Sequence, residues 1–297
     1  MVNLITPPSS TWLSPVSRES TVTDMIDTIA LMFDRSPLAA EAFYQRRLID
    51  IPDFAPIHLR DDVRLIAQRA WLDRARSEYV GVMILKRFWG LLVDVNAPMD
   101  LQELALRMLL DEQRHTHLCI AAAESLGADP EISFDVSELQ QARSQASVTE
   151  QLLEMIVQTF AIGEATALGL IRFAISDLPG SAYRDILKTI AGDEVLHGRI
   201  GVAILTAARA GQTDAWLPWP GDERVDALAR PYLNSMAARD VIATDEAILF
   251  KDPEAARQLR AVGIPDSETF KSAYHQALDK DVAKGFRRLG VWRSDHE

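Results

Sequence analysis

The chain has 297 residues, of which 48% are hydrophobic and 25% are charged, a composition that excludes disordered and collagen-like architectures. The formal net charge of −12 at pH 7 disfavours nucleic acid and anionic membranes as partners. The single cysteine, Cys119, excludes an internal disulfide and a cysteine-held iron–sulfur cluster. Electrons for any redox reaction must therefore come from another molecule or from the substrate.

The predicted elements are helices almost throughout, and no strand pattern is evident. A first helix is expected over 21–45, and Pro52 and Pro56 then break the chain. Four long helices follow, with apolar residues at helical spacing, over about 61–93, 98–127, 147–175 and 181–210. We expect no apolar run to reach the length of a membrane span, because charged residues interrupt every long segment.

Capping signals and connection lengths organise these four helices. Asp100 with Glu103 is a variant of the capping box, and Ser147 with Glu150 is a regular one. The connections are short, long (128–146) and short, and the last of them is a turn at Pro179. Long helices joined in this order are what a four-helix bundle with one crossover requires.

The rest of the chain predicts accessory elements. A rigid aromatic loop over 216–221 contains Trp216 and Trp219, which we expect to anchor the chain. Helices are then expected over 225–250, bent near Pro231, and over 267–289. The predicted fold is a single all-α domain over 1–297, with a core at 61–210 and accessory helices at 21–50 and 222–290.

Two matching motifs stand in the middle of long helices. Asp-Glu-x-x-His occurs at 111–115 and again at 193–197. Glutamate and histidine three residues apart lie on one face of a helix, so Glu112 with His115, and Glu194 with His197, can each reach one metal ion. A single motif of this kind is weak evidence, but two on matching apolar stripes are strong evidence for a metal site.

The other two core helices each carry one acid within an apolar stripe. Glu78 interrupts a stripe that includes Trp71, Val82, Leu85 and Trp89, and Glu164 interrupts one that includes Phe160. Asp73 and Glu154 are rival acids that fit these stripes less well. Four inward carboxylates would repel one another strongly in a low-dielectric core, and two divalent cations would neutralise them.

These residues resemble the ferritin-like di-iron or di-manganese carboxylate proteins, in which one glutamate from each of two helices joins Glu-x-x-His from each of the other two. The resemblance covers 61–210. It implies that Glu78 and Glu164 are terminal ligands and that Glu112 and Glu194 bridge or chelate beside the two histidines. It also implies two iron ions (or manganese, or a mixed pair) with dioxygen as co-substrate. Asp111 and Asp193 would orient His197 and His115 across the helices.

The resemblance predicts a non-haem di-iron oxygenase acting on a small organic substrate, by C–H hydroxylation or amine N-oxygenation, with an external electron donor. Arylamine N-oxygenases are similar in ligand spacing but carry a further histidine where this chain has Ile190. Cys119, Phe160 and Ile190 are candidate pocket residues. The alternatives are a ferroxidase or iron-handling protein and a non-enzymatic helical interaction protein.

Three further expectations concern the cellular location, the oligomeric state and the glycines near the candidate ligands. The first twenty residues lack the basic-then-apolar order of a signal peptide, which favours a cytoplasmic protein. Amphipathic outer helices are compatible with a homodimer. Gly81, Gly163 and Gly201 lie near the candidate ligands, where they either leave room at the site or allow close helix packing.

Overall fold

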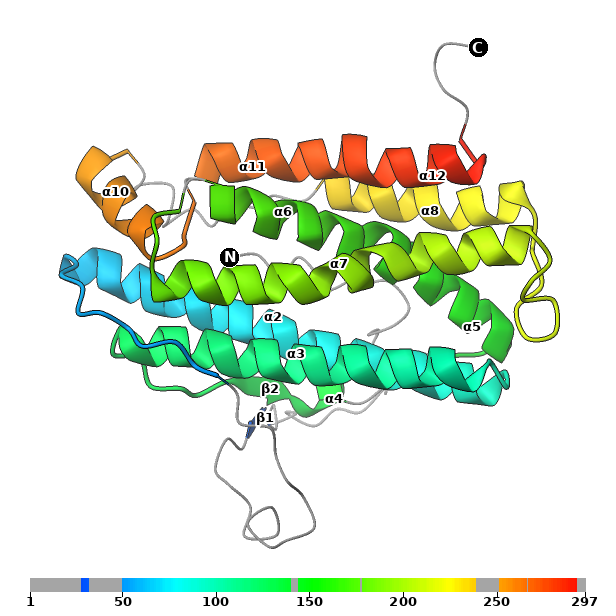
Figure 1. Cartoon of the computed structure of the whole chain (residues 1–297), viewed down its shortest axis with the longest axis horizontal. Coiled ribbons are helices and arrows are strands. Elements are labelled where there is room, and N and C mark those ends of the chain that lie inside the picture. The colour runs from blue at the N-terminus through cyan, green and yellow to red at the C-terminus, as the bar shows by residue number, and fades with distance from the viewer. Residues whose placement is uncertain are drawn as a thin grey trace, which may run out of the picture.

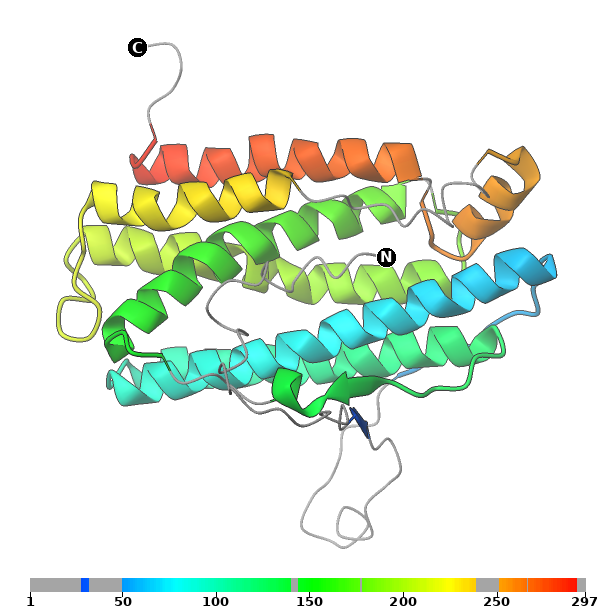
Figure 2. The ribbon, with the colours of Figure 1, turned by 180° about the vertical axis from the view of Figure 1, so that it is seen from behind.

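The structure is a computed structural model that describes residues 28–31, 50–139, 144–176, 178–238, 251–265 and 267–292. The described residues are mostly helical, and the long helices lie roughly along the longest axis of the molecule (Figure 1). The C-terminal helices form a further layer against the segment 148–176 and the helix that follows it (Figure 2). The predicted all-α class is therefore confirmed for the body of the chain.

Helices α2 (Asp61–Asp94) and α3 (Met99–Ser125) form a hairpin with the most extensive packing between any two elements. Asn96 makes the tight connection possible, because it adopts a positive φ that asparagine tolerates better than most residues. The predicted capping box at the start of α3 is wrong. Pro98 is the N-cap, and the carboxylate of Asp100 accepts a hydrogen bond from its neighbour Leu101 instead.

The third long segment changes its helical geometry in the middle. It consists of α5 (Val148–Met155), the π-helix η1 (Ile156–Glu164) and α6 (Ala165–Ser176). The predicted cap is confirmed, since the Ser147 hydroxyl accepts a hydrogen bond from the Glu150 N–H at 3.2 Å. The π-helix was not predicted. Such segments occur frequently at functional sites, and this one ends on a candidate ligand.

Helix α7 (Ala182–Arg209) packs against η1, α6 and α3. Gly201 explains how closely α7 approaches η1: a Cβ atom at this position would lie 2.4 Å from the backbone nitrogen of Ala161. A side chain at this position would collide with backbone that cannot move cheaply. Of the two explanations offered by the sequence, close helix packing therefore applies to Gly201.

The C-terminal elements differ in part from the prediction. Helix α8 (Asp222–Ala237) continues through Pro231, and residues 239–250 of the predicted helix lie outside the described residues. Helix α10 (Pro253–Ala261) was not predicted, although Asp252 caps it through its carboxylate. The predicted segment 267–289 is helical over its whole length, as α11 (Ser267–Gln276), the π-helix η2 (Ala277–Val282) and α12 (Ala283–Leu289).

Two short strands correct the expectation that the chain contains none. Strand β1 (Thr28–Ala30) pairs antiparallel with β2 (Ser133–Asp135), and the short helix α4 (Val136–Leu139) follows. The predicted N-terminal helix is thus wrong at 28–31, and its residues 21–27 and 32–45 lie outside the described residues. The pairing joins segments far apart in the sequence, which local helical periodicity cannot report.

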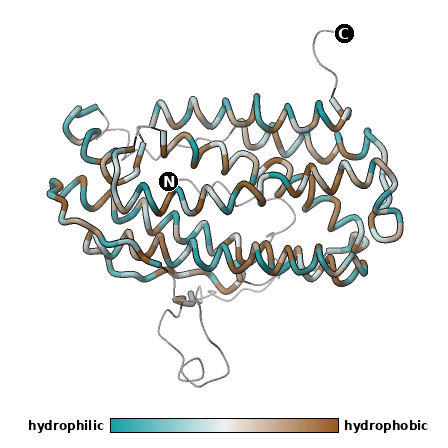
Figure 3. The backbone as a smooth tube through the Cα atoms, in the orientation of Figure 1, coloured by the Kyte–Doolittle hydropathy of each residue, from teal (hydrophilic) through white to brown (hydrophobic). Residues whose placement is uncertain are grey.

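Two apolar clusters make up the core. One, the Phe88 cluster, includes Phe88, Met108, Phe160 and Ile204, and the other, the Trp71 cluster, includes Trp71, Cys119, Phe134, Leu187 and Ile190. Hydrophobic and hydrophilic residues alternate along the long helices, as amphipathic segments require (Figure 3). One stripe assignment is wrong: Trp89 is 36% exposed, and its neighbour Phe88 is fully buried instead. Trp216 and Trp219 pack against the Phe88 cluster, as expected of anchors.

The segment Val148–Ser176 is long and apolar enough to cross a membrane by length and composition alone. This finding corrects the expectation that no run reaches that length. Half of its most apolar window is buried inside the structure, and the segment carries Glu164. A buried core helix passes the same criteria, so the segment is weak evidence for a membrane span.

Candidate metal centre

A polar layer separates the two apolar clusters. Along α3, Met108 belongs to the Phe88 cluster and Cys119 to the Trp71 cluster, and Glu112 and His115 lie between them in sequence. Along α7, the order is reversed: Ile190 belongs to the Trp71 cluster and Ile204 to the Phe88 cluster, on either side of its own Glu-x-x-His motif. The order is reversed because α3 and α7 run antiparallel. The Glu-x-x-His motifs of the two helices therefore lie at the same level, between the two apolar clusters.

The structure brings together all six residues that the sequence singled out as candidate ligands, and each is at most 5% exposed. They come from four elements and form two halves. The α2–α3 half contains Glu78, Glu112 and His115, and the η1–α7 half contains Glu164, Glu194 and His197.

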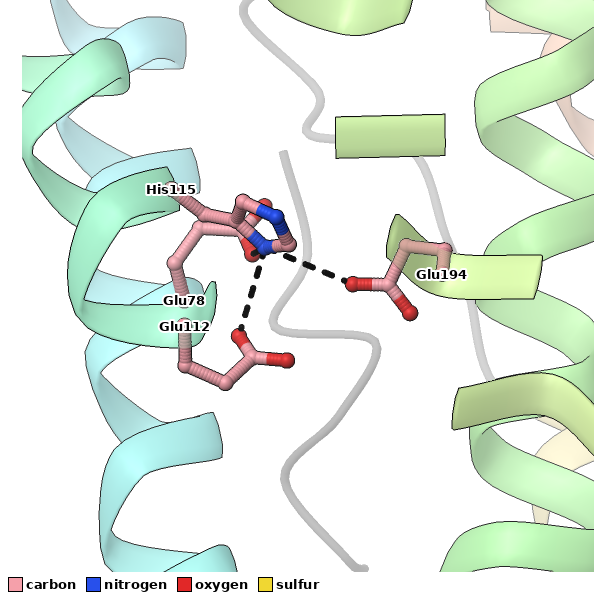
Figure 4. A group of neighbouring side chains, drawn as sticks. All are labelled: Glu78, Glu112, His115 and Glu194. Carbon is pink, nitrogen blue, oxygen red and sulfur yellow. Dashed lines mark ion pairs between the residues drawn. The ribbon is translucent and has the colours of Figure 1, made fainter. Parts of the chain in front are cut away.

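The atoms around His115 are close enough to share one ion (Figure 4). Its Nδ1 lies 3.4 Å from a carboxylate oxygen of Glu78, 3.5 Å from one of Glu194 and 3.8 Å from one of Glu112. One ligand atom from each of these four residues lies within 4.8 Å of all the others. This group could hold a metal ion.

A second group of the same kind surrounds His197 and contains Glu164 and Glu194. Nδ1 of His197 lies 2.9 Å from Oε1 of Glu112 and 3.4 Å from Oε2 of Glu194. The other oxygen of each of these two carboxylates is the one that approaches His115. Glu112 and Glu194 therefore each direct one oxygen towards each histidine.

Unsatisfied polar atoms test whether the donor set fits a cation. Among the described residues, no hydrogen-bond partner exists for one carboxylate oxygen each of Glu112, Glu164 and Glu194, or for Nδ1 of His115. Leaving a buried polar atom unpaired costs about 1–3 kcal/mol. Several such atoms at one place are explained if they bind a cation, so the residues fit a metal site.

The pKa values of the carboxylates differ because their neighbours differ. Burial raises the pKa of Glu164 to about 8, and the nearby charge of Glu112 adds to this increase. Burial likewise raises the pKa of Glu78 and of Glu194. Burial also acts to raise the pKa of Glu112, but its contacts with both histidines outweigh burial and lower the pKa to about 2. Without a cation, one carboxylate is therefore ionised while its neighbours tend to retain protons.

The pKa values of the two histidines also depend on burial and on the neighbouring charges. Burial alone would lower the pKa of each imidazole, but the surrounding carboxylates reverse this effect. Asp193, Glu112 and Glu78 raise the pKa of His115 well above its usual value. Asp111 and Glu112 are the main contacts that raise the pKa of His197 to about 11. Protons thus supply the positive charge that the buried carboxylates require.

The aspartates of the two motifs lie opposite the histidines across the helix interface. Nε2 of His115 is hydrogen-bonded to Asp193 at 3.0 Å, whereas Nε2 of His197 lies 3.8 Å from Asp111. Arg114 pairs with Asp111 at 3.1 Å and also with Asp193, so it connects the two aspartates. Arg114 was not among the residues predicted from the sequence, although its position inside the first motif and its charge were visible signals.

Gly81 is a second feature whose role the sequence left open. A Cβ atom at this position would lie 2.6 Å from Oε2 of Glu112 and 2.7 Å from its carboxyl carbon. Gly81 therefore leaves room at the site. No comparable clash exists at Gly163, where the nearest atom would be 3.5 Å away.

The predicted pocket residues Cys119, Phe160 and Ile190 are all fully buried. Phe160 packs on Phe88 with ring centroids 4.3 Å apart, so its side chain contributes to core packing. A small pocket of about 170 Å³ lies elsewhere, and none of these three residues lines it; its walls are Phe173, Ala174, Leu178, Arg260, Gly263, Ile264, Pro265 and Thr269. The rival acids Asp73 and Glu154 are half-buried and belong to neither candidate ligand group.

Comparison with known proteins gives no match: no protein-family model, no curated protein and no solved structure is detectably similar to this chain. The assignment of the site therefore depends on its geometry and chemistry. Those observations support a mostly helical protein whose buried glutamate and histidine residues could hold a metal ion.

Proposed function

We propose that the chain is a ferritin-like di-iron oxygenase that oxidises a small organic substrate. In this proposal α2, α3, α5–η1–α6 and α7 form the four-helix bundle. Glu78, Glu112, His115, Glu164, Glu194 and His197 are the ligands. The observation that carries the proposal is that Glu112 and Glu194 each direct one oxygen to each histidine. Carboxylates in this position can join two cations.

The donor set favours iron or manganese over the other common protein metals. All six residues offer carboxylate oxygen or imidazole nitrogen, and no thiolate is among them. Ligands of this kind suit iron and manganese, whereas zinc and copper sites commonly include sulfur or have fewer carboxylates. A pair of iron ions would supply reduction of dioxygen at this site.

The protein's own residues orient the ligands and exclude water. The hydrogen bond between Nε2 of His115 and Asp193 favours the tautomer that leaves Nδ1 free to bind a cation. The two apolar clusters on either side of the polar layer keep bulk water away from it. A dry site favours oxidation of a bound organic molecule, with electrons from an external donor.

The test is to load the protein with ferrous iron without oxygen, measure iron per chain, and record optical spectra on mixing with oxygen. We expect two irons per chain and a transient visible absorbance that decays faster when a suitable small substrate is added. Oxidation of many irons per chain, unaffected by substrates, would instead indicate iron handling. Failure to bind metal under any loading condition would overturn the proposal.

A further inference from the structure

Helix α3 presents an apolar stripe on the side opposite the candidate metal ligands. Met99, Leu106 and Leu110 recur at helical spacing and are 68%, 40% and 55% exposed. The elements that pack extensively on α3 among the described residues are α2 and α7. In both views of the ribbon α3 lies at the lower edge of the helical layers (Figures 1 and 2).

One acidic and one basic residue lie beside this apolar stripe. Glu103 and Arg107 are both exposed and lie on the same flank of the stripe, on successive turns. Among the described residues neither side chain takes part in a salt bridge. An acidic and a basic group are therefore both available for a partner.

This arrangement is complementary to itself. A two-fold axis at the level of residue 105 would place a second α3 antiparallel on the first, with Leu106 beside Leu106 of the other copy. The same axis would bring Met99 towards Leu110 of the other copy and Glu103 towards Arg107 of the other copy, because the midpoint of each pair in the sequence lies at or next to residue 105. A two-fold axis lying in the interface keeps each flank against the same flank of the partner, so both charge pairs form together.

We propose that the α3 stripe is the interface through which two copies of this chain form a homodimer. The apolar residues supply the buried centre of the contact, and the two symmetric Glu103–Arg107 pairs select the antiparallel orientation. This proposal is independent of the metal site and of the oxygenase assignment.

The test is the mass of the full chain in solution, measured by light scattering after size exclusion and by sedimentation equilibrium. We expect a dimer for the natural sequence. Glu103→Arg and Arg107→Glu should each weaken dimerisation at least tenfold, because each places like charges together at two symmetric positions. The double variant should recover most of the lost affinity, since both pairs are restored with reversed sign.

Leu106→Glu should give a monomer, because it puts two carboxylates together at the centre of the interface. Leu65→Glu is the matched control: Leu65 is 62% exposed on α2, and its substitution should leave the dimer intact. Helical content by circular dichroism and metal content should be unchanged in all variants. A monomeric natural chain at high micromolar concentration, a dimer insensitive to these changes, or a double variant no better than the single ones would overturn the proposal.

Discussion

The two halves of the buried cluster contain the same residue types, but their histidines are not held equally. In the α2–α3 half, Nε2 of His115 makes a 3.0 Å hydrogen bond to Asp193. In the η1–α7 half, Nε2 of His197 lies 3.8 Å from Asp111, which is beyond hydrogen-bonding distance. The same sequence motif therefore occurs in two different environments: His115 is hydrogen-bonded to the aspartate opposite it, and His197 is not.

The helices that carry Glu78 and Glu164 differ in their regularity, and the more regular helix again belongs to the α2–α3 half. Glu78 lies within the regular helix α2, which packs along α3, whereas Glu164 is the last residue of the π-helix η1. The π-helix is a rare helical geometry, whereas α2 and α3 form a regular and extensively packed hairpin. We therefore expect the α2–α3 half to bind its cation first and more tightly.

The largest expected effect comes from removing a carboxylate shared by the two halves. Glu112→Ala and Glu194→Ala should each reduce bound iron from two ions per chain to one or fewer, because each residue reaches both histidines. His117→Gln on the same helix is the control, since His117 belongs to neither candidate ligand group. Metal analysis of the loaded proteins checks this, and two irons retained in both alanine variants would refute the assignment.

The unequal aspartate contacts predict unequal losses of affinity. Asp193→Asn should weaken binding to the α2–α3 half by about 10–100-fold, the usual cost of losing a carboxylate that orients a ligating histidine. Asp111→Asn should cost less at the η1–α7 half, because that contact is longer. Competition of Co²⁺ against a chelating dye measures both values. Equal losses in the two variants would show that the halves are equivalent.

A smaller effect is expected from filling the space beside Glu112. In Gly81→Ala the new methyl group must displace the Glu112 carboxylate, so affinity at both halves should fall severalfold although the fold persists. Gly90→Ala lies on the same helix with open space around it, and should raise stability by about 1 kcal/mol without changing metal binding. Thermal unfolding and metal titration of the pair separate the two outcomes.

A separate prediction concerns the dependence of metal affinity on pH. The pKa values of Glu164 and His197 are raised to about 8 and about 11 without metal, so both groups retain protons at pH 7 that a cation must displace. Metal affinity should therefore rise between pH 6 and pH 8. The stability that these protonated groups give the metal-free fold should be lost as pH rises from about 4.5 to about 8 for Glu164 and from about 6.5 to about 11 for His197. Calorimetry in buffers of different ionisation enthalpy would count the released protons; a count of zero would contradict this prediction.

Local sequence was sufficient for much of the fold. The long helices begin and end within a few residues of their predicted positions, because helical periodicity, caps and turn residues act over only a few neighbours. Helix α10 was missed although Asp252 and Pro253 mark its start, and two other exceptions lack a local signal. The change to π geometry within 156–164 and the pairing of Thr28–Ala30 with Ser133–Asp135 were both missed.

The identity of the clustered residues was likewise available from the sequence. Two Glu-x-x-His motifs and two isolated acids on apolar stripes identify all six, because an acid within an apolar stripe is costly and so stands out. Tertiary structure alone decided how they are arranged: which oxygen faces which histidine, the connection of the two aspartates by Arg114, and the space left by Gly81. These features depend on contacts between helices distant in the chain, and spacing along one helix carries no information about them.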